Sequence, residues 1–320
     1  MTTVTQAVRE REQGRDVQEP RAPRSRRRRA EDVAGYSFLL PWLLGFFLLT
    51  AGPMLASLYL SFTRYDLFNA PQWVGLDNFR ELFSDPRYRD SVRVTTVFAV
   101  VGVPIKLAAS LAVAMLLNAA LGAKGFYRSA FYLPSLVGAS VSIAIVWRAM
   151  FNDGGIVDQI SQGVGGEAGG WIGDPTRTMP MFILLAVWQF GAPMVIFLAG
   201  LKQVPAELYE AASVDGAGPL RRFLSITLPM LSPVIFFNLL LETINAFQVF
   251  ASAYIISNGT GGPANSTLFY TLYLYRRGFE DFEMGYASAM AWLLVLVVGA
   301  ITFVFFKTSK SWVHYSGETR

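Results

Sequence analysis

The 320-residue chain has no Cys, a single His (His314), and only 16% charged residues. Without Cys it can form neither a disulfide framework nor a thiolate metal or nucleophile site. One His excludes a two-His metal site and argues against a His-based catalytic relay. The sequence also lacks a G-x-x-x-x-G-K-[ST] segment, so the chain is not expected to cradle ATP phosphates. We therefore expect no enzyme activity, no metal site and no cofactor bound by this chain.

Apolar residues, in contrast, make up 53% of the chain, and the mean hydropathy is +0.38. Soluble domains usually have about a quarter of their residues charged, so the composition indicates a membrane protein. Six apolar runs reach the length of a transmembrane helix. The sequence therefore predicts an all-α integral membrane protein. The predicted spans are Tyr36–Phe62, Val94–Ala119, Phe126–Met150, Met179–Leu201, Met230–Ile256 and Met284–Phe306.

Basic residues set the predicted orientation. With six spans, the side that holds both termini carries 17 Lys and Arg, against nine on the other side. Positive residues concentrate in the cytoplasm, so we predict a multi-pass protein of the cytoplasmic membrane with both termini cytoplasmic. The Arg-rich segment 1–35, with "RAPRSRRRRA", lacks periodicity and is predicted to be a disordered tail. A membrane domain over 36–308, containing a polar loop over 202–229, and a short tail over 309–320 complete the organisation.

The polar loop between the fourth and fifth predicted spans contains "EAASVDGAGPLRRFLSITLP", Glu210–Pro229. Pro205 can begin a helix there, and Gly216, Gly218 and Pro219 end it. Two to eight residues would be enough to join two spans, so this longer element needs another explanation. Two interpretations remain open from the residues alone: an interfacial helix that only packs on the bundle, or a docking helix for a cytoplasmic partner.

This stretch follows the pattern E-A-A-x3-G-x9-I-x-L-P and resembles the cytoplasmic loop of membrane subunits of bacterial ABC importers. The resemblance implies the type I permease fold, with a short coupling helix between spans four and five. In that family the helix inserts into an ATP-binding subunit and transmits its closure to the membrane helices. The residues to which the resemblance assigns coupling are Glu210, Ala211, Ala212, Asp215, Gly216, Ile226, Leu228 and Pro229.

Other stretches, including "WVGLDNFRELFSDP" and "NGTGGPANSTLFYTLYLYRRGFEDFEMGYASAMAW", resemble the carbohydrate-importing branch, in particular the larger maltose-transporter permease subunit. The resemblance implies import of a sugar or oligosaccharide. It also implies a second related permease, two ATP-binding subunits that carry ATP and Mg²⁺, and an extracytoplasmic solute-binding protein, with no nucleic acid. Two alternatives are a same-family importer of glycerol phosphate or another polyol, and an ion-coupled secondary transporter.

Polar residues inside a span usually face a cavity or a partner. At helical spacing, the fifth predicted span places several of them on one side, where they form either a substrate path or hydrogen-bonded contacts between helices. By the resemblance, three residues of the fourth span also lie near sugar-contacting positions, and Gly191 and Pro193 are expected to kink that span. A further hypothesis pairs Lys106, in the second span, with Glu242. The candidate path residues are Trp188, Gln189, Phe190, Asn238, Glu242, Asn245 and Gln248, with Ser252 on the same predicted face.

Overall fold

The computed structural model describes residues 36–119, 124–138, 140–166 and 169–313. The predicted tail over 1–35 and the end of the chain after residue 313 lie outside the described residues. The chain forms two compact units, Met1–Ser57 and Leu58–Arg320.

The first unit contributes most of one apolar helix, Tyr36–Ser61, which matches the first predicted span. Its second half comprises the π-helical segment η1 (Phe47–Ala51) and α3 (Gly52–Ser61). None of the most apolar stretch of this helix is buried. A helix that is apolar on all sides and exposed in this way suits a lipid or protein surrounding rather than water.

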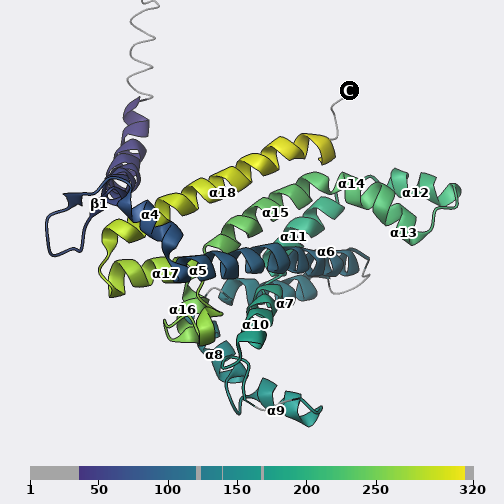
Figure 1. The fold of residues 1–320 in the computed structure, drawn as a ribbon. Helices are drawn as coiled ribbons and strands as arrows, with labels where there is room; N and C mark the ends of the chain where they lie inside the picture. Colours follow the sequence, from purple (N-terminus) through teal and green to yellow (C-terminus); the bar gives the residue numbers. More distant parts are fainter. Residues whose placement is uncertain (1–35, 120–123, 139, 167–168, 314–320) are drawn as a thin grey trace, which may run out of the picture. The chain divides into compact units, whose positions relative to one another are not determined.

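Nearly all the regular structure of the second unit is helical (Figure 1). Its helices are α4 (Asp77–Ser84), α5 (Pro86–Val97), η2 (Phe98–Gly102), α6 (Val103–Ala119), α7 (Lys124–Val137), α8 (Val141–Phe151), α9 (Ile156–Gly163), α10 (Pro175–Trp188), α11 (Gly191–Leu201), α12 (Ala206–Val214), α13 (Pro219–Arg222), η3 (Phe223–Thr227), α14 (Leu228–Met230), α15 (Ser232–Phe247), α16 (Ala251–Ser257), η4 (Pro263–Asn265), α17 (Tyr270–Tyr275), η5 (Arg276–Glu280) and α18 (Met284–Trp312). The all-α prediction missed one small antiparallel pair, in which β1 (Thr63–Arg64) lies against β2 (Gln72–Trp73).

Three helices among the described residues are long and apolar enough to cross a membrane: Tyr36–Ser61, Pro86–Ala119 and Met284–Trp312. They correspond to the first, second and sixth predicted spans, although the second begins at Pro86 rather than Val94. Three further helix pairs pass the same test only together, across a bend. The described residues therefore hold three to six candidate spans.

The third, fourth and fifth predicted spans are interrupted. The third was expected to be one helix over Phe126–Met150 but is divided into α7 and α8. The fourth bends by 46° between α10 and α11, as Gly191 and Pro193 predicted. The fifth was expected to be one helix over Met230–Ile256, and this was wrong at both ends. A 68° bend separates α14 from α15 at Leu231, and α15 stops at Phe247 before α16 begins. The apolar character of a sequence run does not reveal such breaks, because both helices remain apolar.

Proline accounts for a second kind of irregularity, the π-helical turns. Three of the four π segments are followed, two residues after their last residue, by a proline. Proline lacks an N–H, and its ring clashes with the carbonyl four residues earlier, which here lies inside the π segment. The widened turn relieves that clash. The pairs are η1 with Pro53, η2 with Pro104 and η3 with Pro229.

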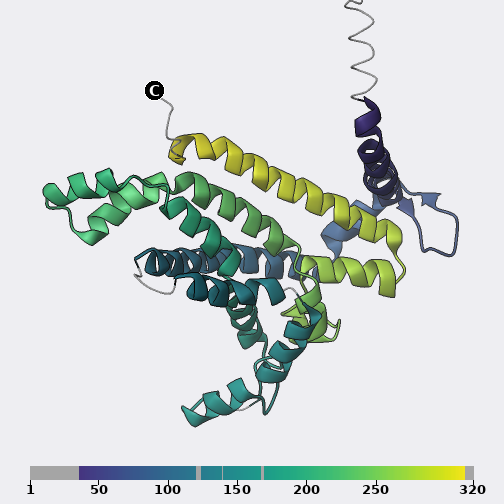
Figure 2. The same cartoon turned by 180° about the vertical axis from the view of Figure 1, so that it is seen from behind.

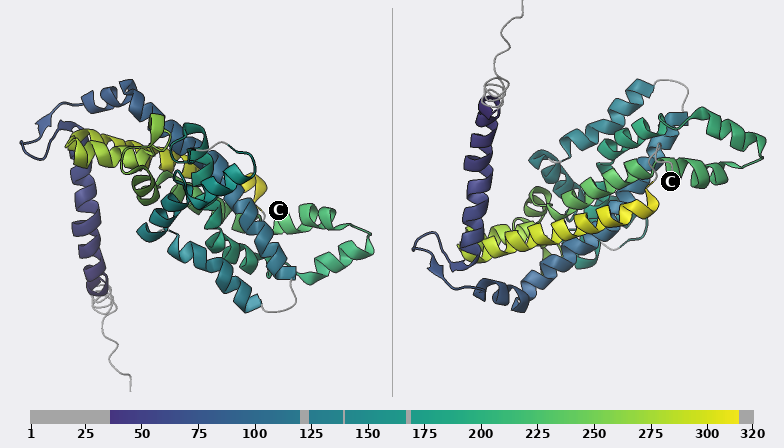
Figure 3. Two further views of the ribbon diagram at one scale, coloured as in Figure 1. Left: turned by 90° about the horizontal axis from the view of Figure 1, so that it is seen from below. Right: turned by 90° about the horizontal axis from the view of Figure 1, so that it is seen from above.

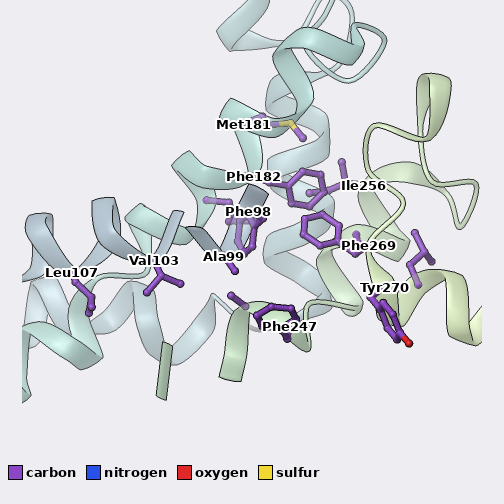
Figure 4. Packing of buried hydrophobic residues seen from close by; sticks show 14 of the residues in the cluster. Phe98, Ala99, Val103, Leu107, Met181, Phe182, Phe247, Ile256, Phe269 and Tyr270 are labelled. Carbon is purple, nitrogen blue, oxygen red and sulfur yellow. The ribbon is translucent and has the colours of Figure 1, made fainter. Parts of the chain in front are cut away.

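The core of the second unit gathers aromatic and aliphatic side chains from helices far apart in sequence. Phe269 lies between Phe98 and Phe182, with ring centroids 5.2 and 5.1 Å apart, both in edge-to-face geometry (Figure 4). Such pairs add about 0.5–1.5 kcal/mol beyond the burial of their area. This contact holds η2, α10 and the segment before α17 together.

Seen from several directions, α12 and α13 project from the second unit at the end opposite α17 (Figures 2 and 3). The hairpin of α12, α13 and η3 is called the loop hairpin below. It is followed by α14 and then by α15, which leads back into the body of the unit.

Gly191 allows the backbones of two helices in this unit to approach closely. A Cβ atom there would lie 2.4 Å from the carbonyl oxygen of Phe131 and 2.8 Å from the Cα of Tyr132. Those atoms belong to the backbone of α7 and cannot rotate away. The packing of α7 on α11 therefore depends on the absence of a side chain at Gly191.

We predict that Gly191→Ala destabilises the protein by about 1–3 kcal/mol, because the added methyl group forces α7 and α11 apart. The midpoint of thermal unfolding of the purified chain in detergent would measure it. The control is Gly299→Ala in α18, where a Cβ would meet nothing within 4 Å. Equal midpoints for both variants would contradict this account of the α7–α11 contact.

Candidate functional site

A cavity of about 440 Å³ lies within the second unit. Its volume falls in the range of about 300–1,000 Å³ that is typical of small-molecule sites. Its wall combines apolar side chains with a few amides and two charged groups. The lining residues are Phe98, Gly102, Val103, Lys106, Gly138, Ser140, Phe182, Leu185, Ala186, Gln189, Glu242, Asn245, Ala246, Gln248, Val249, Phe250, Ala251 and Ser252.

Helix interruptions form much of the wall. Gly102 belongs to the π segment η2, Ser140 caps the start of α8, Gln189 ends α10, and Gln248 ends α15. Irregular backbone in an apolar surrounding carries polar groups that need partners, so it is tolerated where it is buried in protein or lines a cavity. The cavity therefore lies where these helices are irregular.

Two of the lining residues form an ion pair. The Nζ of Lys106 in α6 donates to Oε2 of Glu242 in α15 at 2.7 Å. The two side chains are only 14% and 12% exposed. An isolated charge at this depth is costly, and a partner of opposite sign with a direct hydrogen bond reduces that cost. The hypothesis that Lys106 pairs with Glu242 is confirmed.

Side chains around the α10–α11 break hold its geometry. The Ser110 hydroxyl lies 2.6 Å from the carbonyl oxygen of Lys106 and 3.1 Å from that of Phe190. The Phe190 carbonyl also accepts from the backbone N–H of Met194 at 3.0 Å, so Ser110 adds a second contact at the break. A Cβ at Gly138 would lie 2.4 Å from the side chain of Gln189, so glycine makes room for that amide.

Four of the predicted path residues meet at the cavity: Gln189, Glu242, Asn245 and Gln248. Ser252 also lines it, but from α16 rather than from a continuation of α15. Its position there follows from the turn at Gln248, not from the helical spacing that predicted it.

The other three predicted path residues are not among the cavity-lining residues. Trp188 packs against Trp147, and Phe190 against Phe131, with ring centroids 5.9 and 5.8 Å apart. Asn238 is 2% exposed and donates to the carbonyl of Val234 in its own helix at 3.1 Å. It lies one turn before Glu242, on the side of the 68° bend.

Sequence reasoning missed most of the apolar part of the wall. Phe98, Gly102 and Lys106 recur every four residues, which places them on one face of the second span. That spacing, counted back from Lys106, is the signal by which Phe98 and Gly102 could have been identified as lining residues. Phe182 and Leu185 in α10 offered no comparable signal, because their neighbours in sequence are equally apolar.

The loop hairpin is internally bonded. The hydroxyls of Tyr209 in α12 and Thr227 in η3 lie 2.9 Å apart. Across the turn, Nε of Arg222 donates to the carbonyl of Ala217 at 2.7 Å. Gly216 has a φ of +73°, a left-handed conformation that glycine adopts without strain. The predicted short helix thus exists as α12, tied to the segment that leads into α15.

The residues that the resemblance assigned to coupling fall into two groups. Glu210, Ala211, Asp215 and Gly216 are exposed, and Ala212 is half-buried, all on or just after α12. The second group, Ile226, Leu228 and Pro229, is half-buried in η3 and α14. The first group faces outward and the second connects it to the body of the unit.

These features have a close parallel among known proteins. The family model described as "Binding-protein-dependent transport system inner membrane component" matches residues 89–313. This chain belongs to that family. The match spans η2, the cavity-lining helices, the loop hairpin and all of α18.

Curated relatives of this permease extend over nearly the whole chain. The probable ABC transporter permease protein YesP of Bacillus subtilis is 51% identical, covering 92% of this chain and 96% of the relative. The lactose transport system permease protein LacF of Rhizobium radiobacter is 34% identical, covering 90% and 97%. The sn-glycerol-3-phosphate transport system permease protein UgpA of Pectobacterium atrosepticum is also 34% identical, covering 88% and 95%.

Among solved structures, a chain of a bacterial ABC transporter involved in the import of the acidic polysaccharide alginate has the same fold. The TM-score is 0.73 at 20% identity, covering 90% of this permease and 99% of that chain. A second structure, of the alginate transporter in complex with a pentasaccharide-bound periplasmic protein, gives a TM-score of 0.72 at 21% identity, covering 88% and 95%.

At the end of the permease opposite the loop hairpin, Asp85 joins α5, α17 and α18. Its Oδ1 caps α5 through the backbone N–H of Arg87 at 2.9 Å, and its Oδ2 accepts from the hydroxyls of Tyr273 and Tyr286. Burial raises the pKa of the Asp85 carboxyl, but these hydrogen bonds outweigh it and hold the pKa below its ordinary value. Nearby, burial raises the pKa of Glu283 above its ordinary value, although Arg277 opposes this.

We predict that Asp85→Asn lowers the stability of the permease by about 2 kcal/mol at pH 7. Asn still caps α5, so the change removes mainly the charge. Because the folded pKa is depressed, the stabilisation is complete well above the unfolded pKa of about 3.9. It decreases as the pH falls through the lower folded value, so the stabilities of the two proteins should begin to converge as the pH falls below about 4.

Thermal unfolding midpoints of both proteins between pH 3 and pH 7 would measure this convergence. Exposed Asp153→Asn is the control and should show little difference from the original protein at any pH. A deficit in Asp85→Asn that is the same at pH 3 and pH 7 would show that the carboxylate charge does not stabilise this junction.

Proposed function

We propose that this permease is one membrane subunit of an ATP-driven, binding-protein-dependent importer that moves a sugar or oligosaccharide across the cytoplasmic membrane. Each bent helix pair then counts as one span, which makes six spans with both termini cytoplasmic. A second, related permease completes the membrane part. Two cytoplasmic subunits bind ATP and Mg²⁺, and an extracytoplasmic solute-binding protein delivers the substrate. This chain itself is not an enzyme and binds no cofactor.

One observation carries the proposal: the exposed loop hairpin is bonded internally and continues through α14 into α15, the helix that lines the cavity. Tyr209 links α12 to Thr227, and the chain continues from there through α14 and α15 to Glu242. A force applied to α12 therefore has a continuous path to the cavity wall. Such a path is what an importer needs when hydrolysis takes place on another chain.

The surface of the loop hairpin supports a protein partner. Four large aliphatic side chains are exposed on it, and Val214 is 89% exposed. Exposed apolar groups beside polar ones are typical of interaction sites. The residues are Leu208, Val214, Leu220 and Leu224. Glu210 lies among them and offers a charge to a basic partner surface.

The chemistry of the cavity supports a polyol substrate. Amides of Gln189, Asn245 and Gln248 can both donate to and accept from sugar hydroxyls. The lining rings of Phe98 and Phe250 can pack on the apolar C–H faces of a sugar. LacF and UgpA are named as permeases of lactose and sn-glycerol-3-phosphate transport systems, and both substrates are polyhydroxylated.

An ion-coupled secondary transporter fits these observations less well. It needs an intramembrane carboxylate that exchanges a proton or cation, and Glu242 is already paired with Lys106. It also gives the exposed α12 no role. Membership of a binding-protein-dependent family favours the importer.

We predict that Glu210→Lys abolishes co-purification of the ATP-binding subunit from native membranes, because the reversed charge disrupts docking of α12. Glu207→Lys is the matched control on the same helix, outside the E-A-A pattern, and should retain the subunit. The measurement is the amount of ATP-binding chain recovered per permease. If the unaltered permease recovers none, the proposed function is wrong.

We predict further that Tyr209→Phe keeps the ATP-binding subunit bound but reduces substrate-stimulated ATP hydrolysis several-fold. The ring still packs, but the contact with Thr227 that joins α12 to η3 is lost. Thr227→Ser, which retains a hydroxyl, is the control and should keep most of the stimulation. Unchanged stimulation in Tyr209→Phe would exclude this contact from coupling.

A further inference from the structure

The ion pair makes the cavity electrically neutral. Among the described residues that line the cavity, Lys106 and Glu242 are the charged ones, and they are bonded to each other at 2.7 Å. They reach the cavity from α6 and α15, which are far apart in sequence. Every other polar lining side chain is a neutral amide or hydroxyl. The cavity therefore presents polarity without net charge.

A neutral polyol can use this pair without breaking it. An ammonium has three donors, and a carboxylate has two acceptor oxygens, so one hydrogen bond between them leaves capacity for ligand hydroxyls. The neighbouring amides of Asn245 and Gln248 extend the same kind of contact. A sugar unit thus exchanges its water contacts for hydrogen bonds while the two charges stay neutralised.

A phosphate group meets the opposite situation. A phosphate that uses the remaining donors of Lys106 lies close to the Glu242 carboxylate, and a phosphate that displaces Glu242 leaves that carboxylate in the cavity without its cation. Leaving a buried charge unpaired is strongly unfavourable, and two like charges at short range add to that cost. Glu242, which neutralises Lys106, therefore also disfavours the binding of anions to Lys106.

We propose that the Lys106–Glu242 pair sets the charge selectivity of the cavity, which accepts uncharged saccharide units and excludes phosphorylated polyols. This inference rests on the proposed function in taking the cavity as the substrate path. It distinguishes an uncharged sugar from a phosphorylated polyol as the substrate. Overall sequence identity does not distinguish them, since LacF and UgpA are both 34% identical to this permease.

The test is equilibrium binding of radiolabelled sn-glycerol 3-phosphate to the purified full chain, with its co-purifying subunits, in lipid nanodiscs. Glu242→Gln removes the carboxylate and leaves Lys106 as an unpaired cation. It should bind the probe at least about tenfold more tightly than the unaltered permease, as expected when one hydrogen bond to a charged group becomes available. The double variant Lys106→Met with Glu242→Gln is the matched control and should lose that gain.

A permease that binds the probe as tightly as Glu242→Gln does would overturn the proposal, and so would a folded Glu242→Gln protein with no gain. If Glu242→Gln does not fold, the exchanged pair Lys106→Glu with Glu242→Lys replaces it. That protein keeps the pair and should bind the probe as weakly as the original, whereas tight binding counts against the proposal. Recovery of the ATP-binding subunit is scored separately in the same preparations, so a failure of the proposed function is recognised independently.

Discussion

The constraint that organises this permease is that backbone polar groups in an apolar surrounding need partners. A continuous helix satisfies them internally, so each interruption of a helix needs another solution. Here the breaks at Ser140, Gln189 and Gln248, together with the π-helical turn η2, all meet the cavity. At one of them the carbonyl of Phe190 accepts from the backbone N–H of Met194 and is also contacted by the Ser110 hydroxyl. The polar cavity and the regular helices around it therefore depend on each other.

The sequence predicted the helical organisation where local rules dominate. The first span and the start of the sixth agree with the structure, because a long apolar run has few alternatives to a helix. The α12 helix was predicted from Pro205 and Gly216, whose backbone preferences act within a few residues. The fifth span failed, because its breaks at Leu231 and Gln248 arise from packing between helices, which apolar periodicity does not encode.

The same distinction separates the predictable and unpredictable parts of the cavity. Glu242, Asn245 and Gln248 were recognisable because polar residues are rare in an apolar run. The pairing of Lys106 with Glu242 followed from the need to neutralise two buried charges. Phe98 and Phe182 were not recognisable, because nothing local distinguishes an apolar residue facing a cavity from one facing lipid. Trp188 and Asn238 are residue types expected in such a site but do not line the cavity. A helix bend and one helical turn place them elsewhere.

Packing between α11 and α15 determines how a movement of the loop hairpin would reach the cavity. A Cβ at Gly200 would lie 2.8 Å from Val234 and 2.9 Å from Leu231, so α11 sits tightly against α15 just after its bend. Tightly packed helices move together because their interiors deform little. A displacement of α15 must then be shared by α11, which begins at the break beside Gln189. We therefore expect an input at the hairpin to reach both α15, which lines the cavity, and α11, which begins beside the lining residue Gln189, while the Lys106–Glu242 pair ties α15 to a third element, α6.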